Sequence, residues 1–402
     1  MPKKKLSSDP EARAAGDRLA KLLVSPTVAA IKKMHGSNIL IRGAEYRVQT
    51  YCRLPSGIFP LDYALGGGFA VGMVHTFWGK KDSGKTSKIL RVIANAQRRC
   101  SACFRLRPEW AHLAPGILDG SSVISDSEHV CACKKPRDFV VVYLDIEGTL
   151  SIQWAKALGV DTDQIVLSKP EYAEQGIDVA EGMMRTGELD ILALDSLAFM
   201  TPANEIKKSA VDSLVGEQAR KLGTGVRKLV AAFNFCENNF RRRPTVFFTN
   251  QERMKVGLVF GDPTTVSGGM APGFIASTEV KCWPGKYVMD TYDPKKNPEG
   301  TGRPISGNLQ FRVDKNKTGH PKMEGEYKIV LSETPVKKKG EVADEDFMVD
   351  LAERVGLIGQ KGGWSCLGET DHGSKLAIVE RLEKEPYFKA RLRESLLKVL
   401  SS

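Results

Sequence analysis

The stretch Gly79-Lys-Lys-Asp-Ser-Gly-Lys-Thr86 decides the fold prediction, because it matches the pattern G-x-x-x-x-G-K-[ST]. It follows an apolar run from Val71 to Trp78 and precedes a helical pattern from Lys85 to about Arg99. In such a loop, backbone N–H groups surround phosphates and the helix N-terminus adds positive potential. We therefore expect a nucleotide site in which Lys85 reaches the β- and γ-phosphates and Thr86 supplies a hydroxyl to Mg²⁺. The loop residues predicted to bind the nucleotide are Gly79, Asp82, Ser83, Gly84, Lys85, Thr86 and Ser87.

A nucleotide site also needs carboxylates at the ends of neighbouring buried strands. Asp195 closes the apolar run Ile191–Leu194 and is the predicted magnesium carboxylate together with Thr86, with a helix cap as the alternative reading. Glu147 follows the strand that ends at Asp145, a position that suits a base for the attacking water. Asp145 itself, or a capping role for Glu147, competes with this assignment.

The surrounding pattern predicts an α/β fold. Apolar runs at 139–145, 190–195 and 245–250 alternate with helical patterns, which is typical of a mainly parallel sheet covered on both faces. Segments 278–283, 309–315 and 327–332 alternate more and are predicted to be antiparallel additions. Residues 9–35 read as helical, 214–238 as one long helix, and 346–356 and 374–400 as helices of a small final domain. Residues 334–345 look like an exposed linker.

Composition limits the function classes. The chain has 402 residues, with 59 Lys and Arg against 48 Asp and Glu, so its formal net charge is +11. The surplus suggests an anionic partner, with nucleic acid first. No apolar run approaches the roughly 20 residues of a membrane span, and the charged start Met1-Pro-Lys-Lys-Lys has no signal-peptide character. We expect a soluble intracellular protein without a membrane partner.

Four of the eight cysteines cluster in a segment that interrupts the core pattern, residues 100–137. The pairs Cys100/Cys103 and Cys131/Cys133 are compatible with a four-thiolate structural zinc site. His112 or His129 could replace one ligand, and four reduced thiols in a loop are the alternative. The remaining cysteines are predicted to be ordinary packing residues: Cys52, Cys236, Cys282 and Cys366.

The order of motifs resembles the RecA-type homologous recombinases along nearly the whole chain apart from residues 100–137. Tyr143–Glu147 is similar to the strand that bears the catalytic glutamate in that family, and Leu194–Ala198 to its metal-carboxylate strand. Most specific is the run from Asn250 through Gly257 to Gly269, which resembles the family's second DNA-binding loop with its glutamine switch. Val313–Lys317 is similar to the lysine pair that reaches a neighbouring subunit's nucleotide.

The resemblance implies a RecA-like P-loop ATPase core with a mixed, mainly parallel sheet and a small C-terminal α/β domain. The implied boundaries are 1–48 for an N-terminal helical oligomerisation segment, 49–334 for the core, 100–137 for the zinc-ribbon-like insertion and 335–402 for the C-terminal domain. Within the first of these, residues 28–40 would dock on the next protomer.

The implied function is an ATP- and Mg²⁺-dependent DNA recombinase that polymerises on single-stranded DNA, pairs it with homologous duplex and exchanges strands. Glu147, Lys85 and Gln251 would be catalytic. Trp154 would face the adenine, with core packing as the alternative, and Lys315 and Lys317 would act on the neighbour's nucleotide unless they are simply solvated. The implied DNA-binding residues are Arg220, Arg227, Arg253, Met254, Lys255, Val256, Phe260, Gly268 and Gly269, with a first DNA loop at 205–212.

Two other classes remain open at this stage: a ring-forming helicase or ATPase on the same core, and a recombination mediator that does not exchange strands. The chain also departs from the family pattern. Ser151 stands where an acid is usual near the adenine, and the segment Lys375–Ser402 is basic where bacterial members often end acidic. The insertion and the diverged N-terminus favour a phage or diverged bacterial origin. The expected location is the cytoplasm, on the nucleoid or in a phage host, with single-strand-binding and mediator proteins as candidate partners.

Overall fold

The structure is a computed structural model that describes residues 20–35, 52–113, 129–203, 217–254, 264–266, 271–290, 301–335, 337–361, 364–367 and 371–399. The first DNA loop predicted at 205–212 lies outside these ranges, as do five of the predicted DNA-binding residues: Lys255, Val256, Phe260, Gly268 and Gly269. Of the N-terminal segment, α2 (Pro26–His35) is described, which confirms the helix expected there.

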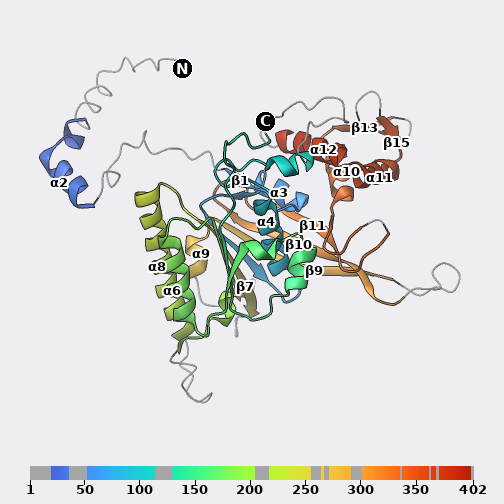
Figure 1. Cartoon of the computed structure of the whole chain (residues 1–402). Helices are drawn as coiled ribbons and strands as arrows, with labels where there is room; N and C mark the ends of the chain where they lie inside the picture. Colours follow the sequence, from blue (N-terminus) through green and yellow to red (C-terminus); the bar gives the residue numbers. More distant parts are fainter. Residues whose placement is uncertain are drawn as a thin grey trace.

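A ten-stranded mixed sheet forms the centre of the molecule (Figure 1). Its strand order is β12-β11-β10-β9-β3-β7-β6-β4-β5, and β8 pairs with β7. The six strands from β9 to β5 in this order run parallel, and β10, β11 and β12 are antiparallel additions. The bounds are β3 (Val74–Gly79), β4 (Val141–Asp145), β5 (Ile165–Ser168), β6 (Ile191–Asp195), β7 (Thr245–Met254), β8 (Thr264–Val266), β9 (Thr278–Met289), β10 (Pro304–Asn316), β11 (Glu324–Val330) and β12 (Val342–Ala343). A separate pair joins β1 (Arg53–Leu54) to β2 (Phe69–Ala70).

The direction predicted for residues 278–283 is wrong. These residues begin β9, which runs parallel to β3, with Thr278 beside His75 and Cys282 beside Gly79. The helix α9 (Ala271–Ile275) returns the chain to the beginning of β3 before β9 starts, so β9 runs in the same direction as β3. The antiparallel direction predicted for 309–315 and 327–332 is confirmed.

Apolar residues fill both faces of the sheet. Along β4, Val141 and Tyr143 enter one buried cluster, with α4, while Val142 and Leu144 enter a second cluster with α6 and α8. This alternation buries both faces of a strand whose sequence reads as continuously apolar. The helices of the core are α3 (Phe59–Leu65), α4 (Lys85–Gln97), α5 (Ile152–Ala157), α6 (Ala173–Arg185) and α8 (Glu217–Phe240), with short 3₁₀ turns η1 (Pro108–Leu113), η2 (Thr162–Gln164) and η3 (Leu197–Phe199).

The last part of the chain forms a small α/β domain around its own apolar cluster, which also takes in Phe59 of the core. It contains α10 (Glu345–Arg354), α11 (Lys375–Lys384), α12 (Pro386–Val399) and a sheet of β13 (Ile358–Lys361), β14 (Trp364–Leu367) and β15 (Asp371–Gly373). The predicted helix at 374–400 is interrupted before Pro386, whose ring ends the preceding helix. In the described part of the chain no helix is long and apolar enough to span a bilayer.

The expectation that residues 334–345 form an exposed linker is wrong for the second half of that segment. Val342–Ala343 pairs with β11 as the edge strand of the main sheet. Asp344 and Glu345 are buried, with 5% of each residue exposed. Lys389 of α12 bonds both carboxylates, at 2.7 Å and 2.8 Å. Asp344 and Glu345 are therefore charged residues of buried ion pairs and not of a solvated linker.

Replacing Lys389 by methionine should lower the free energy of unfolding by about 3 kcal/mol, because the buried carboxylate of Asp344 would lose its bonded cation. Glu345 would keep Lys337, at 3.0 Å. Burial opposes ionisation of Asp344, but Lys389 outweighs it and holds the pKa of Asp344 below its ordinary value. The stabilisation is therefore present at neutral pH and is lost as the pH falls below about 4. Chemical denaturation at pH 7 and pH 3 measures both effects. The exposed Lys384→Met is the control, with a change below about 0.5 kcal/mol.

Candidate nucleotide and DNA site

The phosphate loop fits closely against β9 and β10. Gly79 has φ 143°, and a Cβ there would lie 1.9 Å from the carbonyl oxygen of Cys282. Gly84, the N-cap of α4, has φ 70°, and a Cβ there would lie 2.6 Å from Leu309. Both positions therefore require glycine, and the loop leads directly into the N-terminus of α4, an end that favours an anionic ligand.

Lys85 closes the loop on itself. Its Nζ donates to the carbonyl oxygens of Gly79 and Lys80, at 3.2 Å and 2.6 Å, and lies 3.4 Å from the Ser83 hydroxyl. Burial lowers the pKa of Lys85 below its ordinary value. An ammonium held inside the loop in this way has the position and charge to bind a polyphosphate.

Asp195, at the end of β6, is the centre of the site's polar contacts. Its carboxylate accepts hydrogen bonds from the hydroxyls of Thr86 and Tyr143, both at 2.6 Å, and from Thr249. The residue capping η3 is Ser196, so the capping alternative for Asp195 is not what the structure shows. Thr86 and Asp195 thus meet as predicted, and a hydroxyl beside a carboxylate is an oxygen donor set that suits Mg²⁺.

Glu147 lies just beyond the end of β4, beside Asp195. Its backbone N–H donates to the Asp195 carbonyl oxygen at 3.2 Å. Partial burial and the Asp195 carboxylate raise the pKa of Glu147 above its ordinary value. Asp145, the competing candidate, accepts hydrogen bonds from the N–H groups of Thr149 and Leu150, at 3.2 Å each. Asp145 therefore holds the turn, and Glu147 is the acid left open to a ligand.

Gln251 lies next to the phosphate loop. It is the register partner of Gly79 in the parallel pair β3–β7, and it is half-buried. The strand continues past it, so that exposed Arg253 pairs with Thr265 of β8, and Met254 ends the strand. The residue predicted to sense phosphate and the residues predicted to bind DNA therefore follow each other on one strand.

Trp154 is brought to the same site. Its indole N–H donates to the Ser87 hydroxyl at 2.9 Å, one residue after Thr86, and its ring also packs against the core. Lys339 lies 5.9 Å from the ring centroid. Ser151 caps α5 and accepts from the Trp154 backbone N–H, so its hydroxyl is used structurally.

Lys315 and Lys317 lie away from this chain's own phosphate loop. Lys315 is paired with Glu279 in register and donates to the Gly273 carbonyl oxygen at 2.7 Å. Lys317 is exposed, and its N–H bonds Ser277. The first residue of β9, Thr278, is the register partner of His75 near the beginning of β3. His75 lies four residues before Gly79, which is about 13 Å along the strand. These lysines therefore lie near the opposite end of the strands from their own phosphate loop.

Arg220 and Arg227 are exposed on the first half of α8. A short connection joins the end of α8 to the beginning of β7, so the end of α8 lies near the amino ends of the parallel strands. The first half of α8 therefore lies toward their carboxyl ends. Both arginines therefore lie toward the edge of the sheet that carries Gln251 and Arg253.

The four cysteines of the insertion come together. The sulfur atoms of Cys100, Cys103, Cys131 and Cys133 all lie within 4.8 Å of one another. Burial opposes ionisation of Cys100, but N–H donors including that of Arg137, at 3.3 Å, lower its pKa to about 6. His129 instead faces Glu394 of α12 at 3.7 Å, and the side chain of His112 lies outside the described part of the structure. Four cysteine sulfurs this close together could hold a metal ion, and four thiolates are a ligand set typical of structural Zn²⁺.

The packing role predicted for the other cysteines is right for two of them. Cys236 and Cys282 are buried, whereas Cys52 is exposed. The side chain of Cys366 lies outside the described part of the structure.

Sequence reasoning missed three residues of the site. Tyr143 and Thr249 bond Asp195, and Lys88 lies beneath the loop. Burial raises the pKa of Tyr143 well above its ordinary value, so its hydroxyl remains a donor. Each was visible as a polar residue inside an apolar pattern. For Lys88, the signal is a lysine on the apolar face of α4, one turn before Val92.

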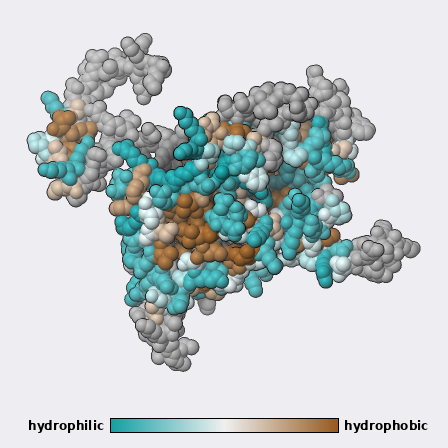
Figure 2. All heavy atoms as spheres, in the orientation of Figure 1, coloured by the Kyte–Doolittle hydropathy of each residue, from teal (hydrophilic) through white to brown (hydrophobic). Residues whose placement is uncertain are grey.

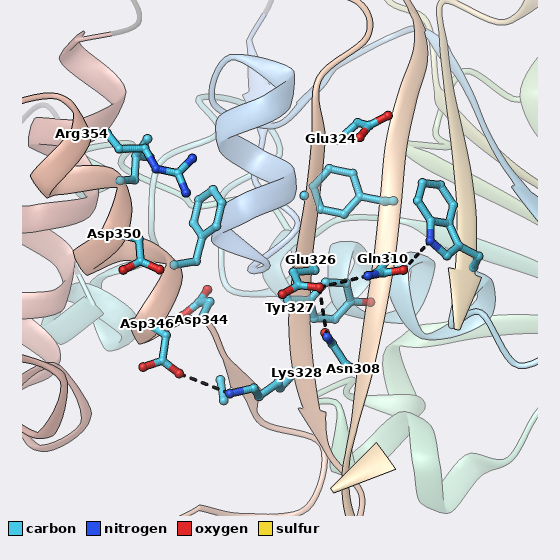
Figure 3. Close-up of a pocket in the computed structure, with 16 residues that line it drawn as sticks. Asn308, Gln310, Glu324, Glu326, Tyr327, Lys328, Asp344, Asp346, Asp350 and Arg354 are labelled. Carbon is cyan, nitrogen blue, oxygen red and sulfur yellow. Dashed lines mark hydrogen bonds and ion pairs between the residues drawn. The ribbon is translucent and has the colours of Figure 1, made fainter. Parts of the chain in front are cut away.

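Away from the phosphate loop, a cavity of about 410 Å³ opens between β10, β11 and α10 (Figure 3). Its lining carries five carboxylates, among them Glu324, Glu326 and Asp346, against the two cations Lys328 and Arg354. A lining of this charge repels phosphates. The charge of this lining therefore does not favour a nucleotide or DNA in the cavity.

A phosphate loop on a parallel sheet, with a hydroxyl and a carboxylate meeting beside it, defines a P-loop nucleotide-binding protein. The family model described as the RecA N-terminal domain matches residues 22–114 and 119–335. The chain therefore belongs to the RecA family of recombinases.

Curated bacterial relatives agree with this family. The chain is 29% identical to Protein RecA of Francisella philomiragia over 378 residues, which is 93% of this chain and 88% of the relative. It is 30% identical to that of Syntrophus aciditrophicus over 356 residues, 88% of this chain and 85% of the relative. It is 32% identical to that of a Nocardioides species over 353 residues, 87% of this chain and 83% of the relative. The predicted recombinase family and the RecA-like core are confirmed.

Proposed function

We propose that the chain is a DNA-dependent ATPase that forms helical filaments on single-stranded DNA and exchanges strands with homologous duplex. The observation that carries this proposal is the register of β3 and β7, in which Gln251 lies beside Gly79. Contacts of Gln251 with a γ-phosphate would favour one arrangement of residues 252–273, and loss of that phosphate would release it. ATP binding would in this way control DNA binding.

Hydrolysis would use the residues gathered around Asp195. Glu147 would take a proton from the attacking water, and Lys85 would stabilise charge on the phosphates. Thr86 and Asp195 would hold Mg²⁺ and its water shell, which supplies further charge stabilisation. Trp154 would lie against the adenine. Arg220, Arg227 and Arg253, with the residues of the 255–269 segment named above, would bind the DNA backbone.

Filament assembly would complete the site in trans. Lys315 and Lys317 would reach the nucleotide of a neighbouring protomer, because they lie too far from their own. Leu22, Val24 and Met34, on or beside α2, are exposed apolar side chains, at 59%, 80% and 70%. Figure 2 shows a broad apolar region on the face of the core near α9. A helix of one protomer that covers an apolar face of the next would hide both surfaces.

Electron microscopy with single-stranded DNA and an unhydrolysable ATP analogue tests the proposal. We expect helical filaments that require both DNA and nucleotide, and few filaments with ADP. Closed rings would instead favour a ring helicase or ATPase on the same core. Particles that bind DNA without polymerising would favour a mediator that does not exchange strands.

The cysteine cluster is proposed to hold a structural Zn²⁺ that folds the insertion. Its support is the close approach of four sulfurs with N–H donors to Cys100 and Cys131. We also propose a cytoplasmic protein that acts on the nucleoid, or in a phage host, beside single-strand-binding and mediator proteins.

A further inference from the structure

A buried lysine lies directly beneath the phosphate loop. Lys88 follows Lys85 by three residues on α4, and none of it is exposed. Its Nζ donates to the carbonyl oxygen of Ser83, a loop residue, at 2.9 Å. The same Nζ lies 5.2 Å from the ring centroid of Tyr327 on β11. The loop is therefore contacted by one lysine from the ligand side and by a second from the core side.

Lys88 has no anionic partner among the described residues. Its side chain faces two polar neighbours, Cys282 and Tyr327, and burial raises the pKa of both. Burial opposes the charge of Lys88, but the adjacent sulfur and phenol outweigh that effect, and the pKa of Lys88 lies above the ordinary value. The site therefore favours the ammonium form of Lys88, which is the form that donates to the Ser83 carbonyl oxygen.

The contact with Ser83 also fixes the direction of a peptide group. In a planar trans peptide, the carbonyl of one residue and the N–H of the next point in opposite directions. Because Lys88 binds the Ser83 carbonyl from the core side, the N–H of Gly84 is turned outward. That is the direction from which a phosphate approaches the N-terminus of α4.

We propose that Lys88 is a positioning residue of the nucleotide site, an inference that rests on the proposed function. It turns the Gly84 N–H of the Ser83–Gly84 peptide toward the phosphates, and it adds a buried positive charge beneath the loop. Lys85 contacts the ligand directly, whereas Lys88 acts through the loop and through its field.

The test is Lys88→Met in the full chain, which keeps the volume of the side chain and removes the charge. We expect the Kd for MgADP, measured by calorimetry, to increase about tenfold, whether or not the melting temperature of the nucleotide-free protein changes. A purely structural lysine would give a lower melting temperature with an unchanged Kd. Lys328→Met, on β11 next to Tyr327 but facing the acidic cavity (Figure 3), should change neither quantity.

A second variant, Lys88→Ala, keeps the test decisive if the methionine of Lys88→Met disturbs the packing of the core. It leaves a cavity, so its melting temperature should fall, but its Kd for MgADP should rise by the same factor as in Lys88→Met. A Kd within twofold of the wild type in both variants, or a rise in the alanine variant alone, would overturn the inference. If the wild-type chain itself does not bind MgADP, the proposed ATPase fails. If the wild type binds and Lys88→Met binds equally well, only the role of Lys88 fails.

Discussion

Glu147→Gln should reduce DNA-dependent ATP hydrolysis about 10³-fold, while MgADP binding stays within about twofold. Glutamine keeps the size and the backbone hydrogen bond of Glu147 but cannot take a proton from water, and a positioned base contributes about 10²–10⁴-fold. Among the described residues the Glu147 side chain makes no hydrogen bond to the phosphate loop, and its interaction with Lys85 and Lys81 is electrostatic. We therefore expect only a small change in nucleotide affinity. Phosphate release in the presence of single-stranded DNA measures the rate, and calorimetry measures the affinity.

The matched control for this change is Glu380→Gln, an exposed acid on α11. It should hydrolyse ATP at the wild-type rate. Asp145→Asn distinguishes the competing base: its carboxylate holds the Thr149–Leu150 turn, so its main effect should be a lower melting temperature. A Glu147→Gln protein that retains a third or more of the wild-type rate would mean that another group is the base.

Cys103→Ser should abolish stoichiometric zinc. Purified under reducing conditions, the wild-type chain should contain one zinc ion per chain, and the variant less than about a tenth of one after dialysis. Structural zinc binds zinc-finger peptides with about 10–16 kcal/mol at pH 7, and loss of one thiolate from a tetrahedral site removes a large part of it. Cys103 is half-buried, so the substitution itself disturbs little packing. Elemental analysis measures the metal.

Cys52→Ser is the control, because Cys52 is exposed and lies outside the cluster. Its zinc content should equal that of the wild type. The insertion also contacts α12 through His129 and Glu394, at 3.7 Å. We therefore expect the Cys103→Ser chain to melt at a lower temperature, and the control to be unchanged. A wild-type chain without stoichiometric zinc would refute the site.

Local patterns were sufficient for the sheet and the loop. A phosphate-loop motif between a strand and a helix placed Lys85 and Thr86, and polar residues at strand ends placed Glu147 and Asp195 at one edge. These assignments follow from chain order, because parallel strands all end at the same edge. The cysteine spacing likewise predicted which four sulfurs would meet. Gln251 was assigned through the family resemblance, and the structure places it at the same edge.

What the sequence could not provide depends on contacts between distant segments. The alternation of residues 278–283 predicts a strand but not its direction, which α9 determines. The charges of 342–345 look solvated until Lys389, more than forty residues later, is seen to pair with them. Lys88 was visible as a lysine on an apolar face, but its meaning depends on Ser83 and on Tyr327 of a strand far along the chain.

The packing of α11 and α12 determines how the basic end of the chain can be studied. Leu382, Phe388, Leu392 and Leu396 fill one apolar cluster with Phe59 of the core. Deleting residues 375–402 would uncover Phe59 and unfold the domain, so any gain or loss of strand exchange would report misfolding as much as charge. Charge reversal at Lys384 and Lys398, whose side chains are 74% and 75% exposed, separates the effect of charge from the effect of misfolding. The electrostatics of this surface can thus be changed while its framework stays in place.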